Sequence, residues 1–383
     1  VTINYRLGAL GFAFWNDLLD PKLELASNLG LRDQLAALSW VRDNVVAFGG
    51  DPENITLFGE SAGGMSIGSL LAAPSARGSF RRAIAQSGAA HHATTREEAT
   101  RISELVLRGM AIDAKSPERL WSAPISEIIT AQRLCWRESV LRGPVGKRLP
   151  QGAMTLLPVG DGEFLPDGPF DAIAGGAARG VDVLCGATAD EWNYFLFFVE
   201  PNKRTVDDAG LKKIFDKRMN GRGQAAIDLY RSALDGPGAP LPAWRIYCAI
   251  ESDRMFRIPA LRLAEACSAH HAGTFMYHFD WKSPLLDGDM GACHAIEIPF
   301  VFGTVDGTFG KAFTGGSAAA QVLSDRTLQA WTSFARTGNP SCELLPEWRP
   351  YEVGKRETMF LAPRCELVPA PFETVRGFWD PLQ

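Results

Sequence analysis

The stretch FGGDPENITLFGESAGG, residues 48–64, decides the fold because it predicts a strand, a tight turn and a helix in succession. Residues 55–58 are apolar or β-branched and predict a short buried strand, and the small and apolar residues 62–71 predict a helix. Ser61 would then stand on the sharp strand-to-helix turn of a nucleophile elbow, with its hydroxyl exposed above a sheet. Gly59 and Gly63 lack Cβ atoms, so we expect them to allow the strained turn and the close approach of strand to helix.

The chemistry expected at Ser61 depends on its neighbours, because a serine hydroxyl is a poor nucleophile without a base beside it. The backbone N–H of Ala62 opens the predicted helix and can donate to a developing oxyanion. A bare GxSxG pattern also occurs in Gly-rich turns that have no catalytic role. The strand before Ser61 and the helix after it are the context that the catalytic interpretation requires.

The longer pattern resembles the active-site signature of the type-B carboxylesterases, the family that includes the cholinesterases. The resemblance implies an α/β-hydrolase with a mostly parallel central sheet, flanking helices and helical cap insertions, and it implies Ser61 as the nucleophile. The segments that carry it are FGG at 48–50, Ile55, Leu57 and GESAG at 59–63, together with NYRLGxxGF at 4–12, DGEFLP at 161–166 and HAIEIPFVFG at 294–303.

The order of elements along the chain predicts a parallel sheet with right-handed crossovers. Residues 92–150 and 205–267 are rich in helix and loop patterns, and we interpret them as cap insertions within a single domain, residues 1–383. Residues 1–5 (VTINY) predict a buried strand, where natural chains seldom begin, so we expect an amino-terminally truncated piece. Strands are predicted at residues 55–58, 82–86, 181–185, 274–281 and 358–361, and amphipathic helices at 31–48 and 321–335.

The composition of the chain argues against several classes of function. The chain has 383 residues, 46% of them hydrophobic, and a formal net charge of −5, which favours neither nucleic acid nor an anionic membrane as a partner. The apolar runs are far too short to span a bilayer. The seven scattered cysteines contain no CxxC, which argues against a zinc ribbon or a thioredoxin-like site. They favour a cytoplasmic location, while secretion stays open because we expect the true amino terminus to lie upstream of Val1.

The six histidines are sorted by the chain order of α/β-hydrolases, in which the serine precedes the acid and the acid precedes the histidine. His294 lies in a loop after a predicted strand, where a movable base is expected, and the esterase histidine segment that it opens supports the same role. His278 lies inside a predicted strand, where core packing with a hydrogen bond is the simpler role. The other four come too early in the chain or lie at the end of a helix (His91, His92, His270 and His271).

The acid is expected in a loop after a strand, and Asp190 and Glu191 both follow the strand at 181–185. Either carboxylate could equally be a solvated surface group. The family resemblance implies an Asp-Glu pair at this place with the Glu as the triad acid, which selects Glu191. Phe195, Phe197 and Phe198 follow it and would line an apolar pocket or pack in the core.

Three further features complete the predicted site. Glu60 would support a protonated His294, hold a water molecule or make a structural hydrogen bond. Asp253 would cap the start of a helix. No metal or other cofactor is implied, since the histidine pairs lack metal-site spacing. In the family the remaining oxyanion donors come from a His-Gly-Gly run upstream of NYRLG. We therefore expect this polypeptide alone to be poorly stable and nearly inactive.

The sequence as a whole predicts a serine esterase that acts on a small-molecule ester through an acyl-enzyme, with Ser61, His294 and Glu191 as the triad. Two rivals stay open at this point. One is a catalytically silent, cholinesterase-like interaction protein, although such members typically lose the serine. The other is hydrolysis of amides or lactones on the same fold, since the fold does not settle the reaction. The ester's identity and the oligomeric state are not predicted.

Overall fold

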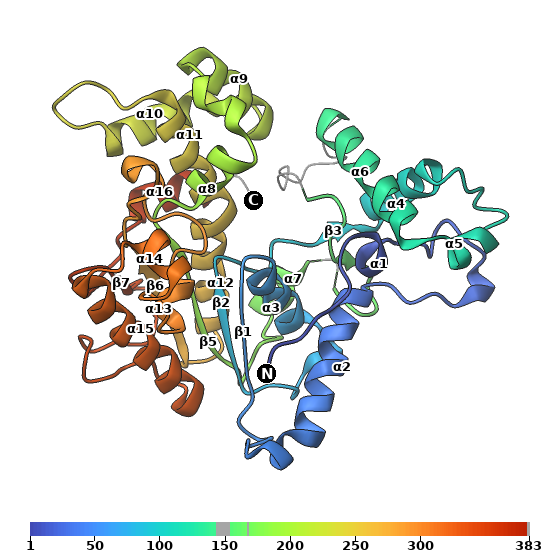
Figure 1. Cartoon of the computed structure of the whole chain (residues 1–383), viewed down its shortest axis with the longest axis horizontal. Helices are drawn as coiled ribbons and strands as arrows, with labels where there is room; N and C mark the ends of the chain where they lie inside the picture. The colour runs from blue at the N-terminus through green and yellow to red at the C-terminus, as the bar shows by residue number, and fades with distance from the viewer. Residues whose placement is uncertain (143–153, 167, 381–383) are drawn as a thin grey trace. The chain divides into compact units, whose positions relative to one another are not determined.

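The chain divides into two compact units (Figure 1). The computed structural model describes residues 1–142, 154–166 and 168–380. We call Val1–Ile55, Gly68–Arg81 and Ala90–Ala178 the helical unit. We call Thr56–Ile67, Arg82–Ala89 and Arg179–Gln383 the sheet unit. The assignment of all 383 residues to a single domain stays a prediction.

The sheet unit is built on a sheet with the strand order β1-β2-β5-β6-β7-β8. Neighbouring strands from β1 to β7 pair in parallel, and the β7–β8 pair is antiparallel. This arrangement confirms the mostly parallel sheet predicted from the sequence. The strands are β1 (Thr56–Glu60), β2 (Arg82–Gln86), β5 (Asp182–Thr188), β6 (Thr274–Phe279), β7 (Thr358–Leu361) and β8 (Glu366–Val368).

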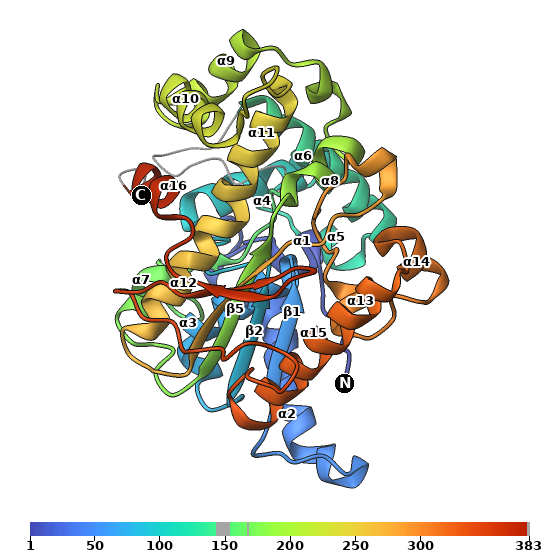
Figure 2. The same ribbon diagram turned by 90° about the vertical axis from the view of Figure 1, so that its left-hand side faces the viewer.

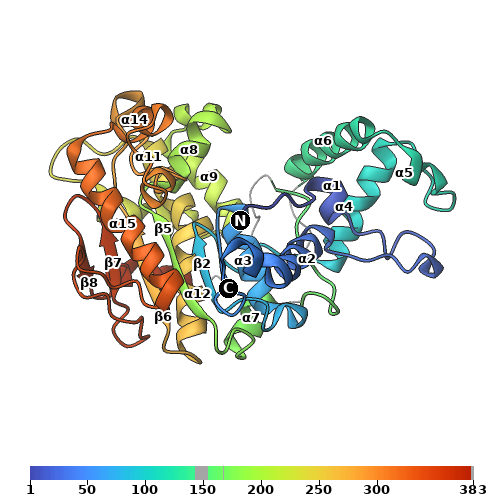
Figure 3. The ribbon, with the colours of Figure 1, turned by 60° about the horizontal axis from the view of Figure 1, so that its bottom comes forward.

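Helices cover both faces of this sheet. Alternate side chains of a strand point to opposite faces, and in β5 and β6 the side chains on both faces are buried. Phe275 and Tyr277 of β6 pack against α15 (Ala318–Thr337), where the Tyr277 and Trp331 ring centroids are 5.2 Å apart. The other face is covered by α12 (Ile258–Ser268), whose Ala260 carbonyl lies 3.6 Å from the Cys185 sulfur. Figure 3 shows α15 and α12 on opposite sides of the strands.

The other helical segments of the sheet unit lie around this three-layer core, and α9, α10 and α11 gather at the top of Figure 2. All of α12 except its last residue lies within the range 205–267 that was predicted as a cap insertion. The helix nevertheless packs directly on the sheet. The segments are α8 (Glu191–Phe198), η4 (Pro201–Thr205), α9 (Asp208–Arg218), α10 (Gly223–Leu234), α11 (Ala243–Ser252), η5 (Asp253–Arg257), η6 (Leu285–Gly288), α13 (Ile298–Val301), α14 (Thr308–Thr314) and α16 (Glu373–Trp379).

The helical unit has its own apolar core, in which α4 (Arg96–Gly109) packs on α6 (Ile125–Arg142) through Ile102, Val106 and Ala131. The predicted cap at 92–150 includes these helices, and its residues 143–150 lie outside the described part. The remaining segments are α1 (Gly8–Phe12), η1 (Pro21–Leu23), α2 (Leu29–Asn44), η2 (Val45–Phe48), η3 (Pro74–Ala76), the parallel pair β3 (Thr94–Thr95) and β4 (Val159–Gly160), α5 (Glu118–Ser122) and α7 (Pro169–Ala174); α3 (Ala62–Ala72) has residues in both units.

At the amino-terminal end of the chain one prediction is wrong, the strand at residues 1–5, and another is confirmed only in part, the amphipathic helix at residues 31–48. Residues 1–5 form no strand, and Val1 is 84% exposed. A β-rich composition favours a strand only where a partner strand and a packing surface are present. In α2 the buried face is formed by Leu31, Gln34 and Leu38, whereas Phe48, placed on the predicted apolar stripe, is 76% exposed. The helix tightens into the 3₁₀ turn η2, which turns its last residues away from that face.

The strand β1 is also less buried than predicted. It is the outermost strand of the described sheet, and Phe58 is 45% exposed, with its ring 6.0 Å from that of Phe302. An apolar run alone does not distinguish a central strand from an edge strand. Within the described residues, no helix is both long and apolar enough to cross a bilayer.

Candidate active site

Ser61 lies between the last residue of β1 and the first residue of α3, as predicted for a nucleophile elbow. Its φ is +56°, a left-handed conformation that non-glycine residues seldom adopt. Two backbone hydrogen bonds hold the turn: Ser61 N donates to Gln86 O at 2.9 Å, and Met65 N donates to Ser61 O at 2.9 Å. The first bond ties the turn to β2, and the second starts α3. The neighbouring structure therefore fixes the strained backbone.

The glycines around Ser61 differ in what they allow. A Cβ on Gly59 would lie 2.8 Å from the backbone carbon of Gly63, and one on Gly64 would lie 2.7 Å from Gln86 O. A Cβ on Gly63 would meet no atom within 4 Å. The prediction for Gly59 is confirmed, but the glycine of α3 that permits close approach to the sheet is Gly64 and not Gly63. The close approach that the GxSxG pattern predicts at Gly63 therefore lies one residue later, at Gly64.

His294 lies between Ser61 and Glu191, although 233 and 103 positions separate it from them in the sequence. Its Nε2 is 2.8 Å from Ser61 Oγ, and its Nδ1 is 2.5 Å from Glu191 Oε2. All three residues belong to the sheet unit. The structure thus brings together the three side chains that the sequence selected, in an arrangement that can move a proton from a hydroxyl to a carboxylate-backed imidazole.

Glu191 is the first residue of α8 and is fully buried. Its Oε1 accepts hydrogen bonds from Ser87 Oγ at 2.6 Å and from Thr188 N at 2.7 Å. Ser87 was not among the site residues predicted from the sequence. It directly follows β2, the strand next to β5, so the shared carboxyl end of these parallel strands was the signal that could have found it.

Asp190, the other candidate acid, has a different role. Its Oδ2 accepts a hydrogen bond from Ala292 N at 2.8 Å and pairs with Lys282 Nζ at 2.7 Å. These contacts tie the loop that carries Glu191 to the loop that leads into His294. Asp190 therefore joins the two loops and does not contact the imidazole.

Glu60 approaches the imidazole from the serine side. Its Oε1 lies 3.1 Å from His294 Nε2, in an ion pair that lacks hydrogen-bond geometry. Burial is the main cause that raises the pKa of Glu60, and the nearby Glu297 adds to it. Burial likewise raises the pKa of Glu297, which accepts a hydrogen bond from Gln86 Nε2 at 3.1 Å. Because Oε1 has no hydrogen-bond partner among the described residues, this atom does not make the structural hydrogen bond that was one of the predicted roles, and support for a charged imidazole stays a prediction.

The pKa of His294 results from opposing effects. Burial lowers it, but the Glu191 carboxylate, with help from Glu60 and Glu297, outweighs burial and raises the pKa to about 9. An imidazolium is therefore well stabilised in this site. That is the species which His294 becomes when it takes the proton of Ser61.

Aromatic side chains surround the His294 ring. The rings of Phe195 on α8 and Phe256 on η5 lie 5.0 Å and 4.8 Å from it, and that of Tyr194 lies 6.3 Å away. Of the three phenylalanines singled out in the sequence, only Phe195 borders the imidazole. Phe197 packs on Trp244, and Phe198 is 61% exposed.

Ala62 is the first residue of α3, so its N–H has no partner within the helix and is free by position to face a substrate oxyanion. That role stays a prediction. Among the described residues, no group of His, Cys, Asp and Glu side chains is arranged to hold a metal ion. His278 is buried between Phe360 and Phe372, and burial holds its pKa well below the usual value.

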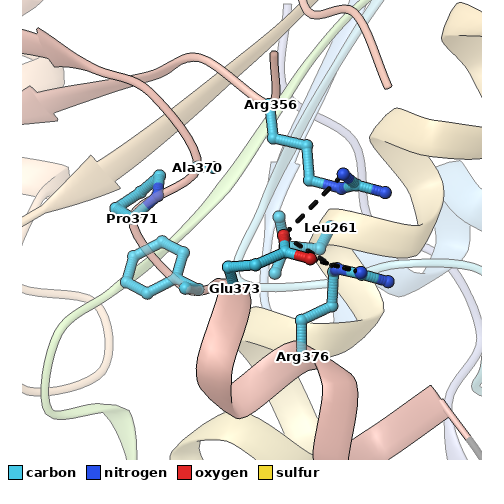
Figure 4. A pocket seen from close by; sticks show the side chains of 7 residues that line it. Leu261, Arg356, Ala370, Pro371, Glu373 and Arg376 are labelled. Atoms are coloured by element: carbon cyan, nitrogen blue, oxygen red, sulfur yellow. Dashed lines mark hydrogen bonds and ion pairs between the residues drawn. The ribbon is translucent and has the colours of Figure 1, made fainter. Parts of the chain in front are cut away.

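A small pocket elsewhere in the sheet unit is too small for a substrate. Arg356, Glu373 and Arg376 line it with apolar neighbours, and Figure 4 shows both guanidinium groups paired with the Glu373 carboxylate. Its free volume of about 10 Å³ is no larger than one water molecule requires.

Comparison with known proteins places the chain among ester hydrolases. Residues 1–368 match the model of the carboxylesterase family. The para-nitrobenzyl esterase of Bacillus subtilis (strain 168) is 37% identical over 369 residues, which are 94% of this chain and 68% of that protein. The cocaine esterase of Homo sapiens is 32% identical over 362 residues, 91% of this chain and 60% of that protein. The chain thus spans about two thirds of the length of these relatives.

Solved structures agree with the sequence comparison. A carboxylesterase of Geobacillus stearothermophilus superposes with a TM-score of 0.85 at 34% identity, over 98% of this chain and 74% of that one. A para-nitrobenzyl esterase structure gives a TM-score of 0.79 at 35% identity, over 98% of this chain and 73% of that one. The α/β-hydrolase fold predicted from the sequence is therefore confirmed.

Proposed function

The chain belongs to the carboxylesterase family, and on that premise we propose that it hydrolyses carboxylic esters through an acyl-enzyme formed on Ser61. The observation that carries the proposal is the pair of hydrogen bonds that links Ser61 to His294 and His294 to Glu191. An uninterrupted chain of this kind is what an activated serine nucleophile needs.

Acylation begins when neutral His294 takes the Ser61 proton at Nε2 while its Nδ1–H donates to Glu191 Oε2. The Ser61 oxygen attacks the ester carbonyl carbon, and the N–H of Ala62 donates to the oxyanion that forms. The tetrahedral intermediate then collapses, and His294 returns the proton to the departing alkoxide, which leaves as the alcohol. Ser61 now carries the acyl group.

Deacylation repeats these steps with water. His294 takes a proton from a water molecule, whose oxygen attacks the acyl carbonyl, and the second tetrahedral intermediate expels Ser61. The Ser61 oxygen recovers its proton from His294, and the carboxylic acid leaves. Glu191 keeps its hydrogen bond to Nδ1 throughout and so holds the imidazole in the required tautomer.

The names of two relatives guide the choice of the first substrates. One is a para-nitrobenzyl esterase and another is a phenmedipham hydrolase. The aromatic rings beside His294 are compatible with an ester that carries an aromatic group. We therefore propose small para-nitrobenzyl and para-nitrophenyl esters as test substrates, with the matching anilide to separate ester from amide hydrolysis.

A fluorophosphonate probe tests the proposal because it labels only an activated serine. The wild-type chain should become covalently labelled and Ser61→Ala should not. Ser268→Ala is a suitable control, since Ser268 Oγ bonds only a backbone carbonyl at the end of α12. Labelling of Ser61→Ala at the wild-type level, or a folded wild-type chain on which the probe leaves Ser61 unlabelled, would refute the proposal.

A further inference from the structure

Between α11 and α12 the chain forms a π-helical turn, η5, at Asp253–Arg257. The N–H of Ile258 donates to Asp253 O, five residues earlier, and the residues on both sides have right-handed helical backbones. Asp253 thus lies inside a continuous helical run, so the prediction that it caps a helix start is wrong. Such a turn widens the helix by one residue and changes the direction in which the next side chains point.

One side chain of this turn reaches the loop that carries Glu191. Arg257 Nη2 donates to the carbonyl oxygen of Ala189 at 3.1 Å. Arg257 Nε also pairs with Asp253 Oδ1 at 2.9 Å, and the guanidinium lies over the Phe372 ring at 4.8 Å. The Arg257 side chain is 15% exposed, and these three contacts hold its guanidinium in place. Ala189 is two residues from Glu191, so this contact fixes the start of the turn in which the acid sits.

Two neighbours of Arg257 in the sequence contact the His294 ring and the residue after Glu191. Phe256, next to Arg257, packs on the His294 ring at 4.8 Å, and Ser252 Oγ accepts a hydrogen bond from Trp192 N at 2.9 Å. The segment from Ser252 to Arg257 therefore touches the residues before and after Glu191 as well as the imidazole. The N–H of Ala189 donates to Phe279 O in β6, and among the described residues Arg257 is the charged side chain that hydrogen-bonds Ala189.

We propose that Arg257 is a positioning residue for the catalytic acid. By binding the Ala189 carbonyl to the turn that also carries Phe256, it sets the distance between the Glu191 carboxylate and the His294 ring. This inference rests on the proposed function, because it gives the segment a role in the same hydrolysis. Arg257 does not touch the reacting atoms and acts only through Ala189 and Asp253.

The far side of the turn provides a matched control. Tyr230 Oη donates to Asp253 Oδ2, and Trp379 Nε1 donates to Tyr230 Oη at 3.0 Å. These contacts secure Asp253 to α10 and α16 but do not involve Ala189. A change at Tyr230 therefore loosens the packing of the segment while the contact between Arg257 and Ala189 remains.

The test measures the Nδ1 proton of His294 by NMR, together with ester turnover. In the wild type we expect a far-downfield resonance for the proton shared with Glu191, assigned by its loss in Glu191→Gln. Arg257→Lys keeps the charge but loses the planar fork that serves Asp253 and Ala189 at once. The double variant Arg257→Met/Asp253→Asn removes the pair without leaving a buried charge uncompensated.

Both variants should move the resonance upfield and lower kcat by about 10- to 100-fold, with KM changed by no more than about twofold, because the acid is misplaced. Tyr230→Phe should lower Tm yet leave the resonance and kcat within about twofold of wild type. The inference is overturned if folded Arg257→Lys keeps the wild-type resonance and kcat, or if Tyr230→Phe moves them equally. The resonance reports geometry without turnover, so failure of ester hydrolysis itself is recognised separately by the labelling of Ser61.

Discussion

The two sides of the His294 ring are both occupied by a glutamate, but the two carboxylates are held very differently. On the acid side, Glu191 accepts hydrogen bonds from Ser87 Oγ and Thr188 N besides its contact with Nδ1. On the serine side, Glu60 Oε1 lies near Nε2 without a hydrogen-bond donor of its own. Burial alone disfavours the charged form, and only donors compensate for it. The Glu191 carboxylate is thus held by three hydrogen bonds, whereas Glu60 Oε1 is held by none within the described part of the chain.

This difference matches what each side of the ring must do. Nδ1 keeps one partner through the whole reaction, so a rigid acceptor is an advantage. Nε2 must exchange protons with Ser61, the leaving alcohol and water, so a second tight hydrogen bond there would compete with them. Glu60 Oε1 lies 3.1 Å from Nε2 and leaves the hydrogen-bonding direction to Ser61.

The largest expected effect comes from changing the acid side. Glu191→Gln keeps the shape but removes the charge and can leave the imidazole in the wrong tautomer, so kcat should fall by about 10³–10⁴-fold. Glu60→Gln is the matched change on the serine side and should cost about tenfold or less. Turnover of a para-nitrophenyl ester by both variants checks this order. Equal losses of kcat in the two variants would show that Glu191 and Glu60 contribute equally to turnover, which contradicts this prediction.

A smaller effect, on the free energy of unfolding, is expected from changes at the two glycines that follow Ser61 in α3. Gly64→Ala forces a Cβ within 2.7 Å of Gln86 O, so we expect a loss of about 2 kcal/mol or more in the free energy of unfolding. Gly63→Ala has open space and should be neutral or stabilising by up to about 1 kcal/mol. Urea unfolding of both variants measures the difference. If Gly63→Ala is the more damaging change, the assignment of the close approach to Gly64 is wrong.

The smallest expected effect is a shift in pH dependence. A general base must be neutral, so kcat/KM should rise with pH up to the raised pKa of His294, about 9. Glu60→Gln removes one of the charges that raise this pKa, so the rise should move to lower pH by about one unit. The profile of Glu60→Gln should be compared with that of Glu53→Gln, an exposed site. Superimposable profiles for all three proteins would exclude a charge effect of Glu60.

The same pKa makes a stability prediction with a definite sign. The folded-state pKa of His294 lies above its ordinary value of 6.5. The stabilisation is therefore fully present below about pH 6.5 and is lost as the pH rises through about 9. The free energy of unfolding should decline over this window, and less steeply in Glu60→Gln, when both are measured by urea unfolding.

Much of the acid–base arrangement could be predicted from sequence because it obeys local rules. The elbow needs a strand, a glycine pair and a helix in one short stretch, and β2 and β7 match their predicted bounds, Arg82–Gln86 and Thr358–Leu361. His294 was selected by chain order, by its place after a strand and by the family resemblance, which also selected Glu191, and the hydrogen bond to Ser61 Oγ agrees with the choice of His294. Its catalytic role, like that of Glu191, stays a proposal.

What could not be predicted depends on contacts between distant segments. Ser87 could be found only through the pairing of β2 with β5, because its bond to Glu191 spans 104 positions of the sequence. The π-helical turn at Asp253–Arg257 has the pattern of an ordinary helix, and its widening shows only in the hydrogen bonds. Val1–Tyr5 has strand-like residues, but pairing is a property of two segments and cannot be inferred from one.

The left-handed backbone of Ser61 narrows the choice of nucleophile at this position. At a φ of +56° a β-branched residue is crowded, so threonine is a poor replacement although it carries the same hydroxyl. Cysteine keeps an unbranched Cβ and fits the turn as serine does. An engineer who wants a thioester-forming catalyst from this scaffold therefore has one natural exchange to try, and directed evolution that starts from threonine would first have to relax the elbow.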